Sequence, residues 1–224
     1  MIPPLIVEAA LERGISLIAV TDHNASANIE AVQLAAKGSN LHVLPGMELQ
    51  TREDVHSLCL FDSLDQISEL QAVVDRSLPD INNKPDHFGE QFVVDAEGEF
   101  IRREERLLIA SSSLSINEAF EVVTSLGGLF IPAHVNRKIF GLIESLGFIP
   151  PELPFPAVEI SRHLSIEEAR KTLPGVGNMP IIQNGDVHRL SEFLGSLHLQ
   201  LGSPIIAELL LSLNRFDGRD YSVV

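Results

Sequence analysis

The sequence predicts an α/β fold, and a closed or distorted β/α barrel is favoured over an open doubly wound sheet. Short apolar segments alternate with amphipathic helical segments along the 224 residues, and this alternation is typical of sheets with parallel strands. Nearly all of the apolar segments are apolar at every position, as strands buried on both faces are. The chain carries neither the glycine fingerprint of dinucleotide-binding folds nor a phosphate-loop motif. We therefore expect a single domain over residues 1–224 with a TIM-like barrel architecture.

In the first third of the chain, helix and strand signals follow one another without a linker. Pro3 and Pro4 open the first helix, because proline suits the first helical turn. Ser63 and Gln66 have the spacing of a capping box, and Pro79 ends the helix that this box begins. These signals predict helices over residues 5–13, 28–37 and 64–78, and strands over residues 15–24, 41–51 and 55–61.

Residues 80–108 differ from the rest of the chain in being polar and rich in turn-forming residues. They contain one short apolar segment, FVVD at 92–95, and a charged run, RREER at 102–106. We interpret them as an insertion over one face of the barrel, forming a lid or a hairpin.

After the insertion the alternation of helices and strands resumes. Ser115 with Glu118 and Ser165 with Glu168 are two further capping boxes. We expect strands over residues 128–135, 157–161 and 181–182, and a short strand over 198–202. Helices are expected over residues 116–126, 138–146 and 205–213, and after residue 165.

The charge of the chain limits the kinds of partner that it binds. There are 31 acidic and 16 basic residues, for a formal net charge of −15, which argues against broad contact with nucleic-acid backbones. A phosphorylated substrate remains compatible with this charge, because bound divalent cations can dominate the field of their site. The single cysteine, Cys59, cannot form an internal disulfide and fits a reducing compartment. With no apolar run of membrane-spanning length and no signal-peptide pattern, the sequence predicts a soluble, cytoplasmic protein without membrane contact.

Histidines and acids gather where the predicted strands end, which is the edge of an α/β barrel that carries function. A single histidine at a strand end is more often a structural residue, but a set of six ligand-type residues reverses that expectation. Asp186 and His188 are two positions apart, so on an extended chain their side chains point the same way and can coordinate one metal ion together. The predicted metal ligands are His23, Glu48, His56, His134, Asp186 and His188.

This mixture of ligands suits a metal-dependent hydrolase. Neutral imidazoles bind Zn, Mn or Fe, and a carboxylate can bridge two ions. Two ions roughly 3.5–4 Å apart can hold a phosphate ester and deliver a hydroxide to it. Glu48 is the candidate bridging carboxylate and, with Asp22, a candidate catalytic residue. Asp22 has the opposite parity to its neighbour His23, so it either orients the ligands or only caps the turn.

Four segments of the sequence resemble the PHP family, the polymerase and histidinol phosphatase superfamily. They are TDHN at 21–24, PGMELQTREDVHSL at 45–58, PAHVNR at 132–137 and NGDVH at 184–188. The resemblance implies a distorted (β/α)₇ barrel with a di- or trinuclear metal site that hydrolyses phosphoesters. By motif, the six predicted ligands resemble the ligands of that family.

One motif of the family is absent. The family begins with an H-x-H strand ahead of the first helix, whereas this sequence starts at Met1 where that helix would already begin. We therefore expect a PHP-type barrel missing its first strand, with a metal site that lacks one position. Open edges are expected at the strands near Ile18 and Ile182, and unpaired edges invite formation of a homodimer.

Three further residues are candidates for binding the substrate phosphate. Arg137 follows His134 by three positions, and Arg162 and His163 end a predicted strand. An arginine at such a place can hold a phosphate with two parallel hydrogen bonds. An ordinary surface arginine and an ordinary loop histidine are equally compatible with the sequence.

Two classes of function follow from these residues. The first is a metal-dependent phosphoesterase that uses a metal-activated hydroxide on a small metabolite, a nucleotide or a nucleic-acid end. The alternative is a truncated or non-catalytic PHP-like module that binds metal or phosphate. A proofreading exonuclease is disfavoured by the short chain and the acidic charge, and nothing in the sequence selects the alcohol half of the ester.

Overall fold

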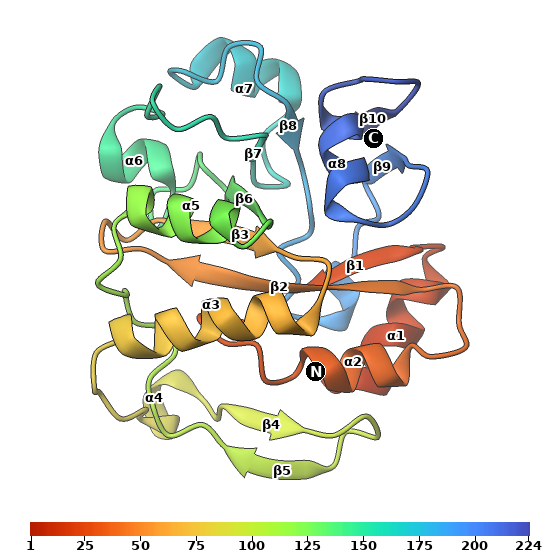
Figure 1. Cartoon of the computed structure of the whole chain (residues 1–224), viewed down its shortest axis with the longest axis vertical. Coiled ribbons are helices and arrows are strands. Elements are labelled where there is room, and N and C mark those ends of the chain that lie inside the picture. Colours follow the sequence, from red (N-terminus) through yellow and green to blue (C-terminus); the bar gives the residue numbers. More distant parts are fainter.

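The computed structural model describes residues 1–224 as a mixed α/β fold (Figure 1). Its main sheet has four strands in the order β1–β2–β3–β6, and a parallel pair, β7 and β8, forms a second sheet. The strands of the two sheets are β1 (Leu17–Val20), β2 (His42–Gln50), β3 (His56–Leu60), β6 (Leu129–Pro132), β7 (Val158–Glu159) and β8 (Ile181–Ile182). Two antiparallel hairpins complete the strands: β4 (Phe92–Val94) with β5 (Phe100–Arg103), and β9 (Leu197–Gln200) with β10 (Asp220–Val223).

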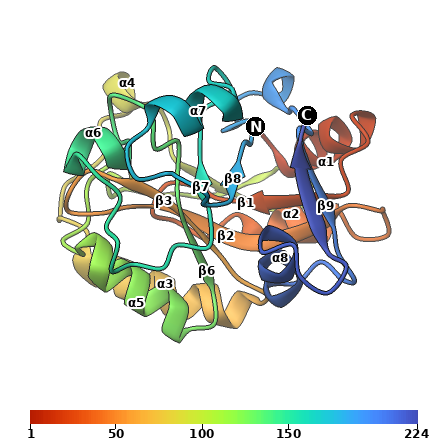
Figure 2. The same cartoon turned by 90° about the horizontal axis from the view of Figure 1, so that it is seen from above.

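Helices cover the sheets on several sides. In Figure 2, α3 and α5 lie together at one side of the molecule, and α1 and α2 lie at the other. No helix has the length and apolar character needed to cross a lipid bilayer. The helices are α1 (Pro3–Glu12), α2 (Ile29–Ala35), α3 (Leu64–Ser77), α4 (Pro85–Phe88), α5 (Ile116–Ser125), α6 (Leu142–Leu146), α7 (Ile166–Thr172) and α8 (Ile206–Leu213), with a 3₁₀ turn η1 at Leu190–Glu192.

The capping boxes predicted from the sequence are confirmed. Ser63, Ser115 and Ser165 each accept the backbone N–H three residues on, and each following Gln or Glu side chain bonds back to the cap. Such a cap contributes about 1 kcal/mol to helix stability. Local polar spacing therefore sets where α3, α5 and α7 begin.

One helix is shorter than predicted. We expected a helix over residues 138–146, but α6 begins only at Leu142. The reason is local, because Phe140 has a left-handed backbone with φ of 62° and cannot be part of a right-handed helix. Its ring instead stacks on His56 with the ring centroids 4.4 Å apart.

The prediction of parallel strands is right for two pairs and wrong for β3. β1 pairs parallel with β2 and β7 with β8, whereas β3 is antiparallel to both β2 and β6. Only residues 51–55 join β2 to β3, and a connection this short cannot cross over to a parallel strand. As a consequence Gln50, which ends β2, faces His56, which begins β3.

The hydrogen-bonded strands form separate sheets and do not close into one ring. β7 nevertheless lies next to the end of β6, since the Val135 N–H donates to the Glu159 carbonyl over 2.9 Å. The two strands expected at open edges, near Ile18 and Ile182, have one hydrogen-bonded neighbour each. The expected hairpin within residues 80–108 is present as β4–β5 (Figure 1).

The largest core lies between the main sheet and its covering helices. α3 contributes Ile67, Leu70 and Val74, all essentially inaccessible to solvent, at the i, i+3, i+7 spacing of one helix face. Phe61 and Phe130 bury full aromatic side chains in the same cluster. Burying each such side chain stabilises the fold by about 1.5–3 kcal/mol, so this core holds rigid the strand ends that carry the polar residues.

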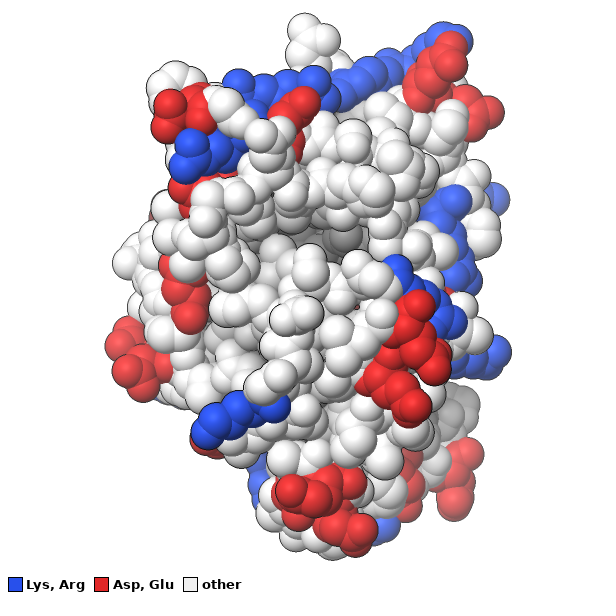
Figure 3. All heavy atoms as spheres, turned by 90° about the vertical axis from the view of Figure 1, so that its right-hand side faces the viewer, with Lys and Arg blue, Asp and Glu red and all other residues white.

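The surface does not present one continuous basic field on the face shown in Figure 3. Acidic and basic side chains are interspersed around its edge, and a largely uncharged area fills its centre. This distribution agrees with the net charge of −15.

Candidate metal centre

A close approach of two strands positions the first histidine. β1 lies beside β2 with Val20 opposite Pro45, and a β-carbon at Gly46 would lie only 2.8 Å from the side chain of Thr21. Glycine at 46 therefore permits the contact. Beyond β1 the ladder continues, because the Glu48 N–H donates to the Asp22 carbonyl over 3.2 Å. This pairing places His23 beside Glu48.

Glu48 is the centre of the site. Its Oε1 lies 2.9 Å from His56 Nδ1 and 3.2 Å from His134 Nε2. Its Oε2 lies 3.3 Å from His23 Nδ1. The three imidazoles come from the end of β1, the start of β3 and the end of β6, and they meet at one carboxylate because β3 runs against its neighbours.

The electrostatics of the cluster favour an ionised carboxylate at Glu48 and a neutral ring at His23. Burial alone would raise the pKa of Glu48, but hydrogen bonds from His134 and His56, together with the charge of His23, hold that pKa well below its usual range. Burial lowers the pKa of His23, and the Glu48 charge only partly opposes this. A neutral imidazole is the form of histidine that binds a metal.

The donor set fits a transition-metal ion. Ligand atoms of His23, Glu48 and His56 all lie within 4.8 Å of one another, a span that bonds of about 2.0–2.2 Å to one ion can bridge after small side-chain adjustments. His56 Nε2 and His134 Nδ1 are buried without a hydrogen-bond partner, and an unpaired polar atom in the interior is costly. The cluster is thus better suited to coordination than to a self-contained hydrogen-bond network.

Asp186 and His188 lie at the rim of this cluster. The His188 ring is 6.1 Å from that of His23, and its side chain is largely exposed. Asp186 Oδ2 pairs with Arg137 at 2.5 Å, while its Oδ1 lies 3.6 Å from His188 Nδ1. The extended chain that we expected for these two residues is wrong, because β8 ends at Ile182 and Asp186 has a left-handed φ of 46°.

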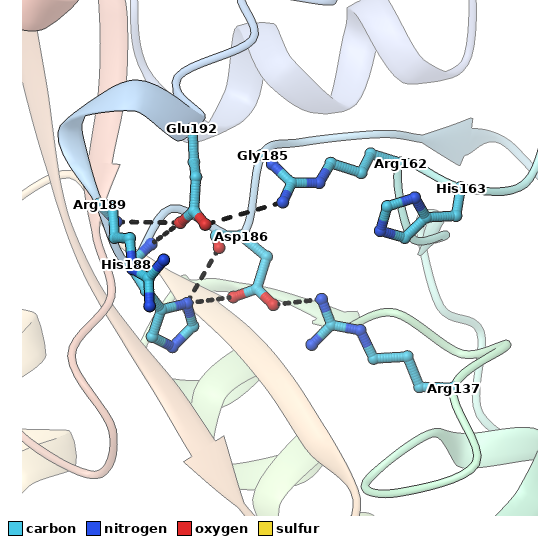
Figure 4. Close-up of a pocket in the computed structure, with 8 residues that line it drawn as sticks. All are labelled: Arg137, Arg162, His163, Gly185, Asp186, His188, Arg189 and Glu192. Carbon is cyan, nitrogen blue, oxygen red and sulfur yellow. Dashed lines mark hydrogen bonds and ion pairs between the residues drawn. The ribbon is translucent and has the colours of Figure 1, made fainter.

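The remaining predicted site residues surround this rim. Asp22 is exposed next to His23, and its Oδ2 accepts a hydrogen bond from Asn28 over 3.3 Å. Arg137, Arg162 and His163 share a pocket with Asp186 and His188, as Figure 4 shows. The predicted residues therefore divide into a buried cluster around Glu48 and a polar pocket beside it.

One buried acid of the site was missed by the sequence analysis. Glu159 lies on β7 and accepts hydrogen bonds from the His134 backbone N–H (3.1 Å) and from Asn184 Nδ2 (3.0 Å). It thereby links the end of β6 to the segment that follows β8. Burial, more than any charge, raises its pKa to about 7. The available signal was a carboxylate within the apolar segment AVEIS, since unpaired acids are rarely buried.

Asn24 was also missed, although it follows the first histidine directly. It is fully buried, and its side chain donates to the carbonyls of Leu108 and Ala110 and accepts the Gln50 N–H. These bonds tie the segment after β5 to the strands that carry the candidate metal ligands. Its position after His23 was the signal, because asparagine tolerates the left-handed backbone (φ of 49°) that a sharp turn requires.

Comparison with known proteins finds relatives mainly at the level of structure. The lesion-specific endonuclease Q of Pyrococcus furiosus superposes with a TM-score of 0.70 at 18% identity, over 99% of this chain and 53% of that one. An Endonuclease Q complex with a 27-mer duplex substrate carrying an abasic lesion at the active site gives the same TM-score at 17% identity, over 98% and 53%. A candidate metal-dependent phosphoesterase of Bifidobacterium adolescentis gives 0.55 at 17% identity, over 96% and 91%.

Sequence comparison adds little to this. No family model matches the chain. An uncharacterized protein of Streptococcus pneumoniae is 28% identical over 67 residues, which are 26% of each chain. The chain thus spans about a quarter of that curated relative and about half of each endonuclease. The structural likeness shows that this chain shares the fold of the two endonuclease structures and of the candidate phosphoesterase.

Proposed function

We propose that this protein is a metal-dependent hydrolase of phosphate esters. The observation that carries the proposal is the contact of three imidazoles, from three separate strand ends, with the single buried carboxylate of Glu48. In this proposal the Glu48 cluster holds the first ions, and the adjoining Asp186 and His188 complete a site for two or three divalent ions of the Zn, Mn or Fe type. The fold would then be a distorted barrel that lacks its first strand.

The residues of the chain have separate roles in the proposed reaction. Bound ions would activate a water molecule and polarise the ester. Glu48 would hold the ions, and its depressed pKa keeps it ionised for that role. Asp22, exposed beside His23 and bonded to Asn28, would orient that histidine from outside the cluster. Arg137, which lies at the rim beside Asp186, would neutralise the ester phosphate.

The substrate would be a phosphorylated small molecule, a nucleotide or a nucleic-acid end. The acidic net charge favours short ligands over long contacts with a duplex. The likeness to an endonuclease keeps a nucleic-acid end among the candidates. A non-catalytic metal- or phosphate-binding module is the second candidate, favoured by the open edges of β1 and β8, which leave the ring of strands around the site incomplete.

The test is a titration followed by a turnover assay. Chelator-treated full-length protein is titrated with Mn²⁺ or Zn²⁺ by calorimetry, and phosphate release is then measured on phosphorylated sugars, nucleotides and short oligonucleotides. We expect saturable metal binding and release from at least one substrate, both lost in Glu48→Gln and retained in Glu121→Gln, whose side chain is exposed on α5. Metal binding without any release would select the non-catalytic module, and equal metal affinity of all three proteins would contradict both candidates.

A further inference from the structure

Beside the Glu48 cluster lies a pocket of about 350 Å³ with no hydrophobic residue in its lining. Figure 4 shows its side chains arriving from three loops, those that follow β6, β7 and β8. The lining residues are Arg137, Arg162, His163, Gly185, Asp186, His188, Arg189 and Glu192. A lining made only of charged and polar residues and one glycine suits a small polar ligand.

The pocket has the opposite charge balance to the chain. Three arginines face two acids in it, whereas the whole chain carries a net charge of −15. Arginine side chains that line one pocket can bind phosphate oxygens through charge-assisted hydrogen bonds. The pocket is therefore selective for an anion within an otherwise repulsive field.

Glu192, one of the two acids of the pocket, makes no short ion pair with an arginine. Glu192 Oε2 is held by the backbone N–H groups of His188 and Arg189, each over 2.9 Å. Its Oε1 reaches Arg162 only at 3.7 Å. The guanidinium of Arg189 makes no ion pair. An incoming anion thus meets Arg162 and Arg189 without first breaking a short salt bridge.

The position of the pocket separates two anion sites. Arg137 lies on the side of Asp186 and His188, next to the Glu48 cluster, and pairs with Asp186 at 2.5 Å. Arg162 lies on the side of Glu192 (Figure 4). One phosphate at the metal centre would contact Arg137, and the remaining arginines would still face an open cavity.

We infer that Arg162 and Arg189 form a second anion subsite, and that the substrate carries a second phosphate next to the one that is hydrolysed. The inference rests on the proposed phosphoesterase function and narrows its substrate class. A small bisphosphate and a terminally phosphorylated oligonucleotide both offer this chemistry, because each places another phosphate near the scissile one. A simple monophosphate leaves the subsite unfilled.

The first arm of the test needs no metal. Binding of inorganic phosphate to chelator-treated protein is measured by calorimetry for the wild type, Arg162→Gln, Arg189→Gln and the control Arg76→Gln, whose side chain is exposed on α3. We expect the two pocket variants to bind phosphate roughly tenfold more weakly, as the loss of a charge-assisted hydrogen bond predicts, and the control to match the wild type. Equal affinities in all four proteins would overturn the subsite.

The second arm uses the metal-loaded protein and compares KM between paired substrates. The pairs are a sugar bisphosphate with its monophosphate, and a 5′-phosphorylated tetranucleotide with the mononucleotide. We expect a lower KM for at least one two-phosphate member, and Arg189→Gln should reduce that preference about tenfold. The pair that shows the preference identifies the source of the second phosphate. Turnover with no preference in either pair overturns the subsite.

The two arms also separate this inference from the function on which it rests. Arginine-dependent phosphate binding in a protein that neither binds metal nor releases phosphate would support the subsite and refute the phosphoesterase. Normal turnover with identical KM values in the wild type and Arg189→Gln would support the phosphoesterase and refute the subsite.

Discussion

Replacing Glu159 by Gln is expected to remove a pH dependence from the stability of the metal-free protein. Glu159 is buried on β7 and bonds to the His134 backbone and to Asn184. Burial raises its pKa from an ordinary 4.5 to about 7. Because the folded state keeps this proton up to a higher pH than the unfolded chain does, the folded state is favoured at low pH. The contribution is fully present below pH 4.5 and is lost as the pH rises through 7.

The magnitude follows from the shift in pKa. A difference of about 2.5 pKa units at 1.36 kcal/mol each corresponds to roughly 3 kcal/mol over the whole range. Between pH 5.5 and 8, which avoids the region of the isoelectric point near 4.8, about 2 kcal/mol of this remains. Glutamine resembles the protonated carboxyl in shape and does not titrate. The free energy of unfolding of Glu159→Gln should therefore lack this decrease with rising pH.

The assay is urea denaturation followed by circular dichroism at several pH values, with a chelator present throughout. The free energy of unfolding of the wild type should fall by about 2 kcal/mol relative to Glu159→Gln between pH 5.5 and 8. Glu121→Gln, which removes an exposed carboxylate, should show the same pH dependence of the free energy of unfolding as the wild type. Parallel curves for the wild type and Glu159→Gln would refute the assignment of a buried, protonated carboxyl at this position.

Three further predictions test the site and its support. Glu48→Gln should weaken Mn²⁺ binding roughly 100-fold or more, since it removes the charge shared by three imidazoles. A calorimetric affinity within threefold of the wild type would contradict the central role of Glu48. Asn24→Ala should lower the free energy of unfolding by about 3 kcal/mol through the loss of its bonds to segment 108–110 and to β2, and amide exchange should rise in that segment. Gly128→Ala would place a β-carbon 2.3 Å from the Phe61 ring and should cost about 1–3 kcal/mol in urea denaturation, so an unchanged midpoint would show that this core can adjust.

Much of the candidate site could be predicted from the sequence because its polar residues lie within apolar segments or directly beside them. His23, Glu48, His56 and His134 are brought together as expected. After β8 the predicted geometry was less accurate, because Asp186 and His188 lie at the rim of the cluster. Alternation along a strand applies only while the backbone stays extended, and the left-handed φ of Asp186 ends that condition.

The direction of β3 is a second feature that the sequence analysis did not predict. His56 stands at the start of its strand, where a parallel sheet would have placed it at the edge away from the site. The short 51–55 connection reverses β3 and brings His56 opposite Gln50. The loop length was available in the sequence and was a signal for this reversal, but the prediction of parallel strands did not take it into account.

The sequence by itself determined which residues are able to bind a metal, where the three capped helices begin, and which apolar segments form the core. Those properties depend on side-chain chemistry and on spacings of a few residues. Only the tertiary structure decided that Glu48 is the shared partner of three rings, that Glu159 bonds to the His134 backbone, and that three arginines line one pocket with Asp186 and His188. These contacts join residues far apart in the chain, and their distances depend on how the strands pair, which no local pattern specifies.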